Sequence, residues 1–261
     1  MNPTPNQPAI RMQDVTVSSR RDVTHAVVTS VNWTVAPGEF WVVGGLQQSG
    51  KTDLLMLTAG LLYPQSGSYE LFGRETRDLG EAELAERLRV AYVFDHGQLF
   101  NQLTIAENIA LPLRYRNNLE AVEAVRETLD LLELLELTPL AEATPASVSR
   151  DWLKRAALAR ALVLRPRLLL CDHPLSGLGT RHRQWWLQFL DQLWRGHERF
   201  GGEPMTVVVT TEDLAPWQQP EHRLALLRTQ QFLSLGTWTE AARSTDPTVG
   251  EWLAATPATT L

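Results

Sequence analysis

The chain has little that would suit an oxidising or membrane environment. It has one cysteine, Cys171, in 261 residues, so no disulfide framework exists and a reducing compartment is expected. Cys171 lies in an apolar run and is interpreted as a small buried residue. No run reaches the ~18 apolar residues of a membrane helix. The N-terminal stretch MNPTPNQPAI is polar and proline-rich, unlike a signal peptide. These absences predict a cytoplasmic protein.

A basic surface is also missing from the composition. The 24 Lys and Arg residues face 30 Asp and Glu residues, which gives a formal net charge of -6. Wholesale binding of nucleic acid is therefore not expected. The length, by contrast, is ample, because a chain of this size can bury roughly 70 to 75% of its unfolded surface. A sizeable core is expected.

Strand-like and helix-like segments alternate along the chain. Strands are expected within 10–43, at 90–94, at 167–172, from 206 and, as the last, at 222–228; helices are expected from 51, from 104, at 120–137, at 150–165 with Ser149 as its cap, and at 181–199. Such alternation favours an α/β domain with a largely parallel sheet. We expect a single domain with a core of about 10–94 and 165–240, a helical subdomain of about 95–150 and a C-terminal tail of about 240–261.

The clearest chemical motif is GLQQSGKT, residues 45–52, which matches G-x-x-x-x-G-K-[ST] between an expected strand and an expected helix. Backbone N–H groups of such a loop, aided by the helix N-terminus, can surround a phosphate chain. Lys51 is expected to pair with the β and γ phosphates, and the Thr52 hydroxyl to ligate Mg²⁺. The predicted nucleotide-binding residues are Gly45, Leu46, Gln47, Gln48, Ser49, Gly50, Lys51 and Thr52.

A second motif ends the apolar strand LLLC. Asp172 follows this strand as a Walker B aspartate does, which places a carboxylate beside the Mg²⁺ site. An apolar run followed by aspartate says little alone. With the phosphate loop upstream it predicts a magnesium site made by Thr52 and Asp172.

In this order the motifs resemble the nucleotide-binding subunit of ABC transporters across nearly the whole chain. ALARAL (157–162) precedes the Walker B strand, and DHPLSGLG (172–179) stands where the family reads DEPTSGLD. The resemblance implies a P-loop NTPase (RecA-like) core with a parallel sheet, an N-terminal antiparallel β portion and an inserted helical subdomain. It also implies ATP and Mg as cofactors, and a homodimer or a heterodimer with another ATPase subunit.

Three segments resemble more narrowly the ATPase of Mla-type lipid transporters. They are HGQLFNQLTIAENIALPLRY (His96 to Tyr115), LKRAALARAL and RSTDPTVGEWL (Arg243 to Leu253). This resemblance implies a membrane permease, which the family contacts through the first of these segments, and an MCE-type substrate-binding protein as partners. It implies a location at the inner face of the cell membrane.

The family's hydrolytic residues are mostly replaced. Asp95 stands at the position of the glutamine that reaches Mg²⁺ and the attacking water, His173 at that of the catalytic glutamate, and Glu212 at that of the switch histidine. The LSGGQ signature reads VSRDW (148–152) and keeps only Ser149, which the resemblance still implies as a contact to nucleotide. The other departures are Gly179 for the aspartate of SGLD, Gln48 for the middle glycine of the loop, and no aromatic residue near Ser19 to stack on adenine.

These changes are expected to affect hydrolysis more than the fold, because phosphoryl transfer needs an oriented water and charge stabilisation. Asp95, Asp151 and Glu212 are expected to add negative charge near the phosphates unless Mg²⁺ or Arg150 compensates. We expect an ATP-binding subunit of a lipid transporter with weak or absent hydrolysis and a regulatory or structural role. Two alternatives stay open: an active ATPase with His173 as base, and an adaptor that binds no nucleotide. A structural pair between His173 and Glu212 is a further hypothesis.

Overall fold

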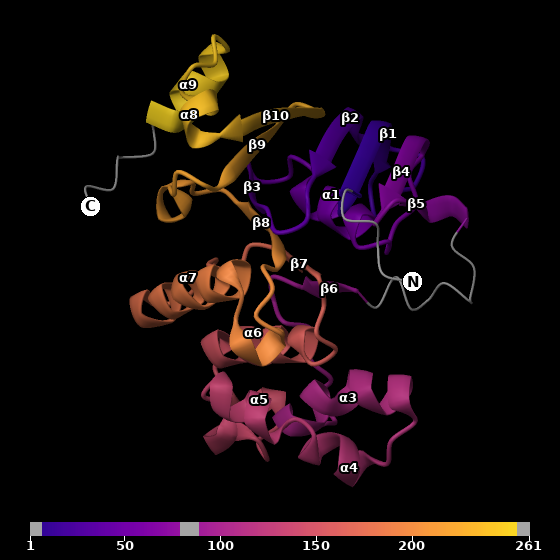
Figure 1. Ribbon diagram of the computed structural model, residues 1–261, viewed down its shortest axis with the longest axis vertical. Coiled ribbons are helices and arrows are strands. Elements are labelled where there is room, and N and C mark those ends of the chain that lie inside the picture. The colour runs from indigo at the N-terminus through magenta and orange to yellow at the C-terminus, as the bar shows by residue number, and fades with distance from the viewer. Residues whose placement is uncertain (1–6, 79–88, 255–261) are drawn as a thin grey trace.

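The computed structural model describes residues 7–78 and 89–254 of the chain. The first six residues of the proline-rich N-terminal stretch and the last seven of the expected C-terminal tail lie outside these ranges. The described strands form one sheet in the order β5-β4-β1-β2-β10-β9-β3-β8-β7-β6 (Figure 1). They are β1 (Ile10–Ser18), β2 (Ala26–Val35), β3 (Phe40–Gly45), β4 (Ser66–Leu71), β5 (Arg74–Glu75), β6 (Val90–Val93), β7 (Leu168–Cys171), β8 (Thr206–Thr211), β9 (Arg223–Arg228) and β10 (Gln231–Thr237).

The sheet has a parallel part and an antiparallel part, which confirms the fold class. Strands β6, β7, β8, β3 and β9 run parallel to one another. Strand β1 pairs antiparallel with β2 and β4, and β10 pairs antiparallel with β9. Because β3, β8, β7 and β6 are parallel neighbours, the loops that follow them all leave from one edge of the sheet, the edge where open α/β sheets bind ligands.

The helices are grouped at the two ends and beside the sheet. Figure 1 shows α3, α4 and α5 together at one end, with α6 between them and β6 and β7, and α8 and α9 at the other end near β10. They are α1 (Lys51–Thr58), α3 (Ile105–Asn117), α4 (Ala121–Arg126), α5 (Leu129–Leu134), α6 (Arg150–Leu162), α7 (Thr180–Arg195), α8 (Trp238–Ala241) and α9 (Pro247–Ala254). Among the described helices, none has the length and hydropathy needed to cross a bilayer.

The continuous apolar run at β7 is explained by burial on both faces of the sheet. Leu169 and Cys171 belong to the core on the side of α6 and α7, whereas Leu168 and Leu170 belong to the core on the side of α1 and β1. A strand buried on both faces has no polar alternation, as parallel sheets require. Cys171 is fully buried, as interpreted from the sequence, and burial raises the pKa of its thiol.

Three expectations about elements are wrong in detail. The helix expected at 120–137 is two helices, α4 and α5. They are separated where the Thr128 N–H (3.0 Å) and hydroxyl (2.7 Å) both donate to the Val125 carbonyl, an i−3 bond in place of the helical i−4 bond. Ser149 occupies the N-cap position of α6, but its side chain makes no capping hydrogen bond. The strand at 223–228 is followed by β10, through Thr229 and Gln230 with φ of 39° and 65°. Such hairpin turns usually carry glycine or asparagine, so this one left no sequence signal.

Candidate functional site

The loop between β3 and α1 depends on its two motif glycines. Gly50 has φ 94°, and a Cβ there would lie 2.8 Å from Val28 Cγ2. A Cβ on Gly45 would lie 2.6 Å from Ser49 Oγ. Gln48, at the position of the family's middle glycine, also adopts a left-handed φ of 63°. A non-glycine residue in that region costs free energy, and such outliers concentrate at functional loops.

Lys51 is enclosed by the loop that precedes it. Its side chain is buried, and Nζ donates to the carbonyl oxygens of Gly45 (2.8 Å) and Leu46 (2.7 Å). Within the part of the chain that the structure describes, no carboxylate forms an ion pair with it. Burial lowers the pKa of Lys51, while the more distant charges of Glu212 and Asp172 act in the opposite direction. The ammonium group is therefore held by neutral oxygens and has no counter-ion in contact.

Thr52 and Asp172 are brought together across the sheet edge. Asp172 directly follows β7 and is 4% exposed. Its Oδ2 accepts from the Thr52 hydroxyl (2.9 Å) and its Oδ1 from the Thr210 hydroxyl (2.7 Å). Thr210 Oγ1 in turn accepts from the His173 N–H (2.9 Å). A carboxylate beside a hydroxyl offers the hard oxygen ligands that Mg²⁺ takes, so these residues fit the metal implied by the resemblance.

Thr210 is a site residue that the sequence reading missed. It lies near the carboxyl end of β8, the strand between β3 and β7. Its signal is weak but present: a hydroxyl residue at the end of an otherwise apolar central strand faces the same edge as the phosphate loop.

A cavity of about 710 Å³ opens over this edge of the sheet. It is large enough for a nucleotide-sized ligand. Its walls come from the turn after β1, the phosphate loop and the ends of β6, β7 and β8; among the sequence-derived candidates they include Gln47, Gln48, Ser49, Gly50, Lys51, Thr52, Asp95, His173 and Glu212. Arg20 and Arg21 line the end of the cavity near Ser19, where no aromatic residue stands. Ser149 does not line it.

His173 lies over the cavity in a left-handed conformation with φ 45°. Its Nε2 is 4.0 Å from Asp172 Oδ1. Burial is the largest influence on the ring and lowers its pKa, although Asp172 opposes this effect. Among the described contacts no hydrogen bond or ion pair joins His173 to Glu212, so the structure does not support the hypothesis of a structural pair.

The carboxylates expected near the phosphates are not equivalent. Asp95 Oδ1 lies 2.9 Å from Lys154 Nζ and 3.7 Å from Arg150 Nη2. Asp151 lies 3.8 Å from His182 Nε2 on α7 and does not line the cavity. Asp95 thus has the compensation by Arg150 that was expected, and an ion pair with Lys154 that was not. Asp151 lies outside the cavity, against His182, and so does not add its charge to the cavity wall. Glu212 alone lines the cavity as an exposed carboxylate with no ion pair among the described residues.

The segment at the signature position folds back on its own chain. Ser149 precedes α6, and the Arg150 guanidinium lies against Gly177, where a Cβ would be 2.7 Å from Nη1. Arg150 Nη2 is also 3.3 Å from His96 Nδ1. Arg150, which replaces a glycine of the family's signature, therefore packs its side chain on the turn after Asp172.

Comparison with known proteins agrees with a P-loop nucleotide-binding fold. Residues 28–176 match the family model described as ABC transporter. Two dimeric structures of the ATP-binding cassette MJ0796, one of them bound to ADP and Pi after hydrolysis, superpose with TM-scores of 0.73 at 27% and 28% identity, covering 85% of this chain and 95% of theirs. The chain belongs to the ABC transporter family.

Curated relatives are import ATP-binding proteins by name. The spermidine/putrescine protein PotA of Thermotoga maritima is 34% identical over 81% of this chain and 54% of its own length. The methionine protein MetN 2 of Paraburkholderia xenovorans is 33% identical over 89% and 59%, and the sulfate/thiosulfate protein CysA of Photorhabdus laumondii is 32% identical over 83% and 58%. The chain thus spans somewhat more than half the length of these relatives, and none of the three is named for lipids.

Proposed function

We propose that the chain is an ATP-binding subunit of an ABC-type membrane transporter that retains nucleotide binding and hydrolyses ATP weakly or not at all. The observation that carries this is a contrast at one edge of the sheet. Lys51, Thr52 and Asp172 are placed together as phosphate and Mg²⁺ binding require, whereas His173 stands at the position of the family's catalytic glutamate with its ring 4.0 Å from Asp172. The loop N–H groups and Lys51 would hold the phosphates, and Thr52 and Asp172 the Mg²⁺. When bound, the metal neutralises charge on the β and γ oxygens.

The proposal of weak hydrolysis rests on the geometry around His173. A base must be held by a third group that fixes its orientation and tautomer. His173 touches Asp172 only at 4.0 Å, and Asp95, at the position of the family's glutamine, is paired with Lys154. Among the described contacts, Glu212 forms no hydrogen bond or ion pair with the ring. No described side chain is thus arranged to orient both the histidine and a water molecule.

Two measurements on the purified chain test this function. Calorimetry is expected to show binding of Mg-ATP, and a phosphate-release assay is expected to show turnover far below the roughly 1 to 100 per second of phosphoryl-transfer enzymes. Turnover in that range, abolished by Lys51→Ala, would establish the alternative of an active ATPase with His173 as base. Absence of Mg-ATP binding would establish the alternative of a structural adaptor.

The partner proposal concerns a groove between β6, α3 and α6. This groove, of about 230 Å³, is lined mainly by apolar side chains: Val90, Ala91, Tyr92, Phe94, Pro112, Arg160, Ala161 and Leu164. We propose that it and the adjoining segment 96–115 receive a short helix of a permease at the inner face of the membrane. Phe100 is 53% exposed, whereas Leu99 packs against the core. Phe100→Glu should therefore abolish co-purification with the permease in a folded chain, and unchanged co-purification would refute the docking.

The cargo proposal is a lipid, supported by the resemblance of segments 96–115, 153–162 and 243–253 to lipid-transport ATPases. An MCE-type substrate-binding protein is the corresponding further partner. Mass spectrometry of the transporter purified with this chain should find bound phospholipid. Specific retention of a polyamine, methionine or sulfate instead would assign the cargo class of the curated relatives. Light scattering with and without a second ATPase subunit distinguishes a homodimer from a heterodimer.

A further inference from the structure

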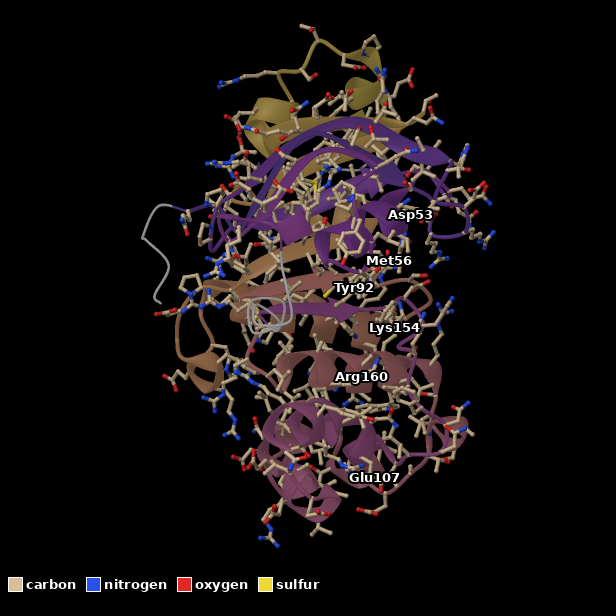
Figure 2. The ribbon with its side chains drawn as sticks, turned by 90° about the vertical axis from the view of Figure 1, so that its right-hand side faces the viewer. Asp53, Met56, Tyr92, Glu107, Lys154 and Arg160 are labelled. Carbon is tan, nitrogen blue, oxygen red and sulfur yellow. The ribbon has the colours of Figure 1, made fainter. Side chains whose placement is uncertain are left out.

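The chain has only two lysines, Lys51 and Lys154, and the second has no place in the nucleotide site as described. Lys154 lies in the middle of α6 with its side chain 1% exposed. Its Nζ donates to the carbonyl oxygens of His173 (2.8 Å) and Ser176 (2.9 Å) and lies 2.9 Å from Asp95 Oδ1. Figure 2 labels Lys154 between Tyr92 of β6 and Arg160 of α6.

These contacts connect two segments that both border the cavity. The carbonyls belong to the turn directly after Asp172, and the carboxylate follows β6. An ammonium group has three N–H donors, and a buried ammonium is tolerated only when it is paired and hydrogen-bonded. Here the carbonyl oxygens of His173, Ser176 and, at 3.4 Å, Pro174 accept from Nζ, and the Asp95 carboxylate forms an ion pair with it. Burial lowers the pKa of Lys154 while Asp95 opposes this, as expected for a buried ion pair.

We propose that Lys154 is a positioning residue that fixes the turn of residues 173–176 against the end of β6 through Asp95, and that Asp95 is its counter-ion and not a ligand of magnesium or nucleotide. The turn needs such support, because His173 has a left-handed φ of 45°. Only the identity of the ligand rests on the proposed function. The ion pair and its structural effect stand without it.

The proposal makes Asp95 and Glu212 behave differently although both line the cavity. If Asp95 were a free cavity charge, Asp95→Asn and Glu212→Gln would both tighten binding of anionic nucleotide. As a counter-ion, Asp95 cannot be removed without leaving a buried ammonium unpaired, which is strongly destabilising. Glu212→Gln is therefore the matched control, since it removes the same charge from the same cavity without touching Lys154.

The first experiment is a double-mutant cycle in thermal unfolding without nucleotide, so its result does not depend on ATP binding. Asp95→Asn and Lys154→Met are each expected to lower Tm by roughly 10 °C. The double variant should lose less than half of the summed loss, because neither charge is then left alone. Glu212→Gln should change Tm by less than about 2 °C. Additive losses in the double variant would overturn the proposal. Should a single variant be too unstable to purify, recovery of a folded double variant supports it, and failure of the double variant as well overturns it.

The second experiment separates positioning from a general structural role. ATP affinity is measured with and without Mg²⁺ in the wild type and in the double variant. The ratio of the two affinities should stay within about threefold of the wild-type ratio, because Asp95 is not a metal ligand. A ratio that falls tenfold or more would make Asp95 part of the metal site and overturn the assignment. Backbone amide signals of His173 and Ser176 should shift in Lys154→Met, and unchanged signals would contradict positioning.

Discussion

The two lysines, one in α1 and one in α6, differ in whether a counter-ion contacts the ammonium group. Lys51 begins α1 and is held by neutral oxygens, the carbonyls of Gly45 and Leu46 and the Ser49 hydroxyl, whereas Lys154 in α6 has the carboxylate of Asp95 at 2.9 Å. Both side chains are buried beside one cavity. Burial of a cation therefore does not identify a ligand-binding residue. A cation without a counter-ion in contact can still gain a favourable interaction with phosphate, and a cation that already has one cannot gain as much.

Helix α6 carries a second buried cation, Arg155, which contacts residues of neighbouring elements. Its replacement is predicted to cause the largest loss of stability. Arg155 Nη1 lies 2.8 Å from Glu136 Oε2, and its guanidinium packs on the rings of Trp185 (3.8 Å) and Trp152 (4.5 Å). Arg155→Met is expected to lower the free energy of unfolding by about 3 to 4 kcal/mol through the lost charged hydrogen bond and two cation–π contacts.

Urea unfolding measures this loss, with the exposed Arg126→Met of α4 as a control that should stay within about 0.5 kcal/mol of the wild type. A loss below about 1 kcal/mol in Arg155→Met would contradict the conclusion that the buried cations of α6 stabilise the fold.

The sequence predicted the residues of the phosphate and metal site but not the residues that support them. Lys51, Thr52 and Asp172 were found because their motifs are local and their strand–loop–helix context is readable. Lys154 and Thr210 were not, because their partners lie in other elements: His173 for Lys154, and Asp172 for Thr210. A buried lysine in a helix has no pattern that distinguishes it from an exposed one until the turn after β7 is placed beside it.

The fold shows an equivalent limit. The apolar runs of β3 and β7 and the valines of β8 were readable because burial on both faces removes the polar alternation of a half-exposed strand. The break between α4 and α5 and the hairpin to β10 depend on single residues, Thr128 and the pair Thr229 and Gln230, whose conformations are set by neighbouring backbone. Such choices are made by tertiary contacts and not by propensity.

A further buried basic residue, His222, differs from Lys51, Lys154 and Arg155 because burial favours its neutral form. Its Nδ1 lies 2.9 Å from the Trp217 carbonyl and its ring stacks on Phe40 at 3.9 Å. Burial lowers its pKa to about 4. An unfolded histidine titrates near 6.5, so between these values the unfolded state binds the extra proton. Stability should therefore fall as pH falls from about 6.5 to about 4, by about 3 kcal/mol in total.

Urea unfolding at pH 7 and pH 4.5 in the wild type and in His222→Phe isolates this contribution, since other groups titrate equally in both. The acid-induced loss should be smaller in His222→Phe. Equal losses would show that the histidine is charged in the folded state.

Replacement of Lys51 in α1 is predicted to weaken nucleotide binding without unfolding the chain. Lys51→Ala should weaken Mg-ATP binding by about 1.5 to 3 kcal/mol, or roughly 10- to 150-fold, the value of a charged hydrogen bond. The control is Arg126→Ala, which removes a cation from the exposed face of α4, outside the cavity, and should alter affinity by less than about threefold. If calorimetry gives the same Mg-ATP affinity for the wild type and Lys51→Ala, Lys51 does not bind nucleotide and the proposed difference between Lys51 and Lys154 is wrong.

The smallest expected effect is that of His173→Glu, which restores the family's catalytic residue in a turn fixed by Lys154. A carboxylate at that position would still share the cavity wall with Glu212, Asp95 would still be paired with Lys154, and the segment 148–152 would still lack the family's glycines. Residues that act as a unit in catalysis are strongly non-additive, so one restored member recovers little. Phosphate release by His173→Glu should therefore stay within about twofold of the wild type, with Lys51→Ala as the background. A rise to about 1 per second or more, within the range of phosphoryl-transfer enzymes, would show instead that the base alone was missing and that the ion pair of Lys154 and Asp95 is compatible with hydrolysis.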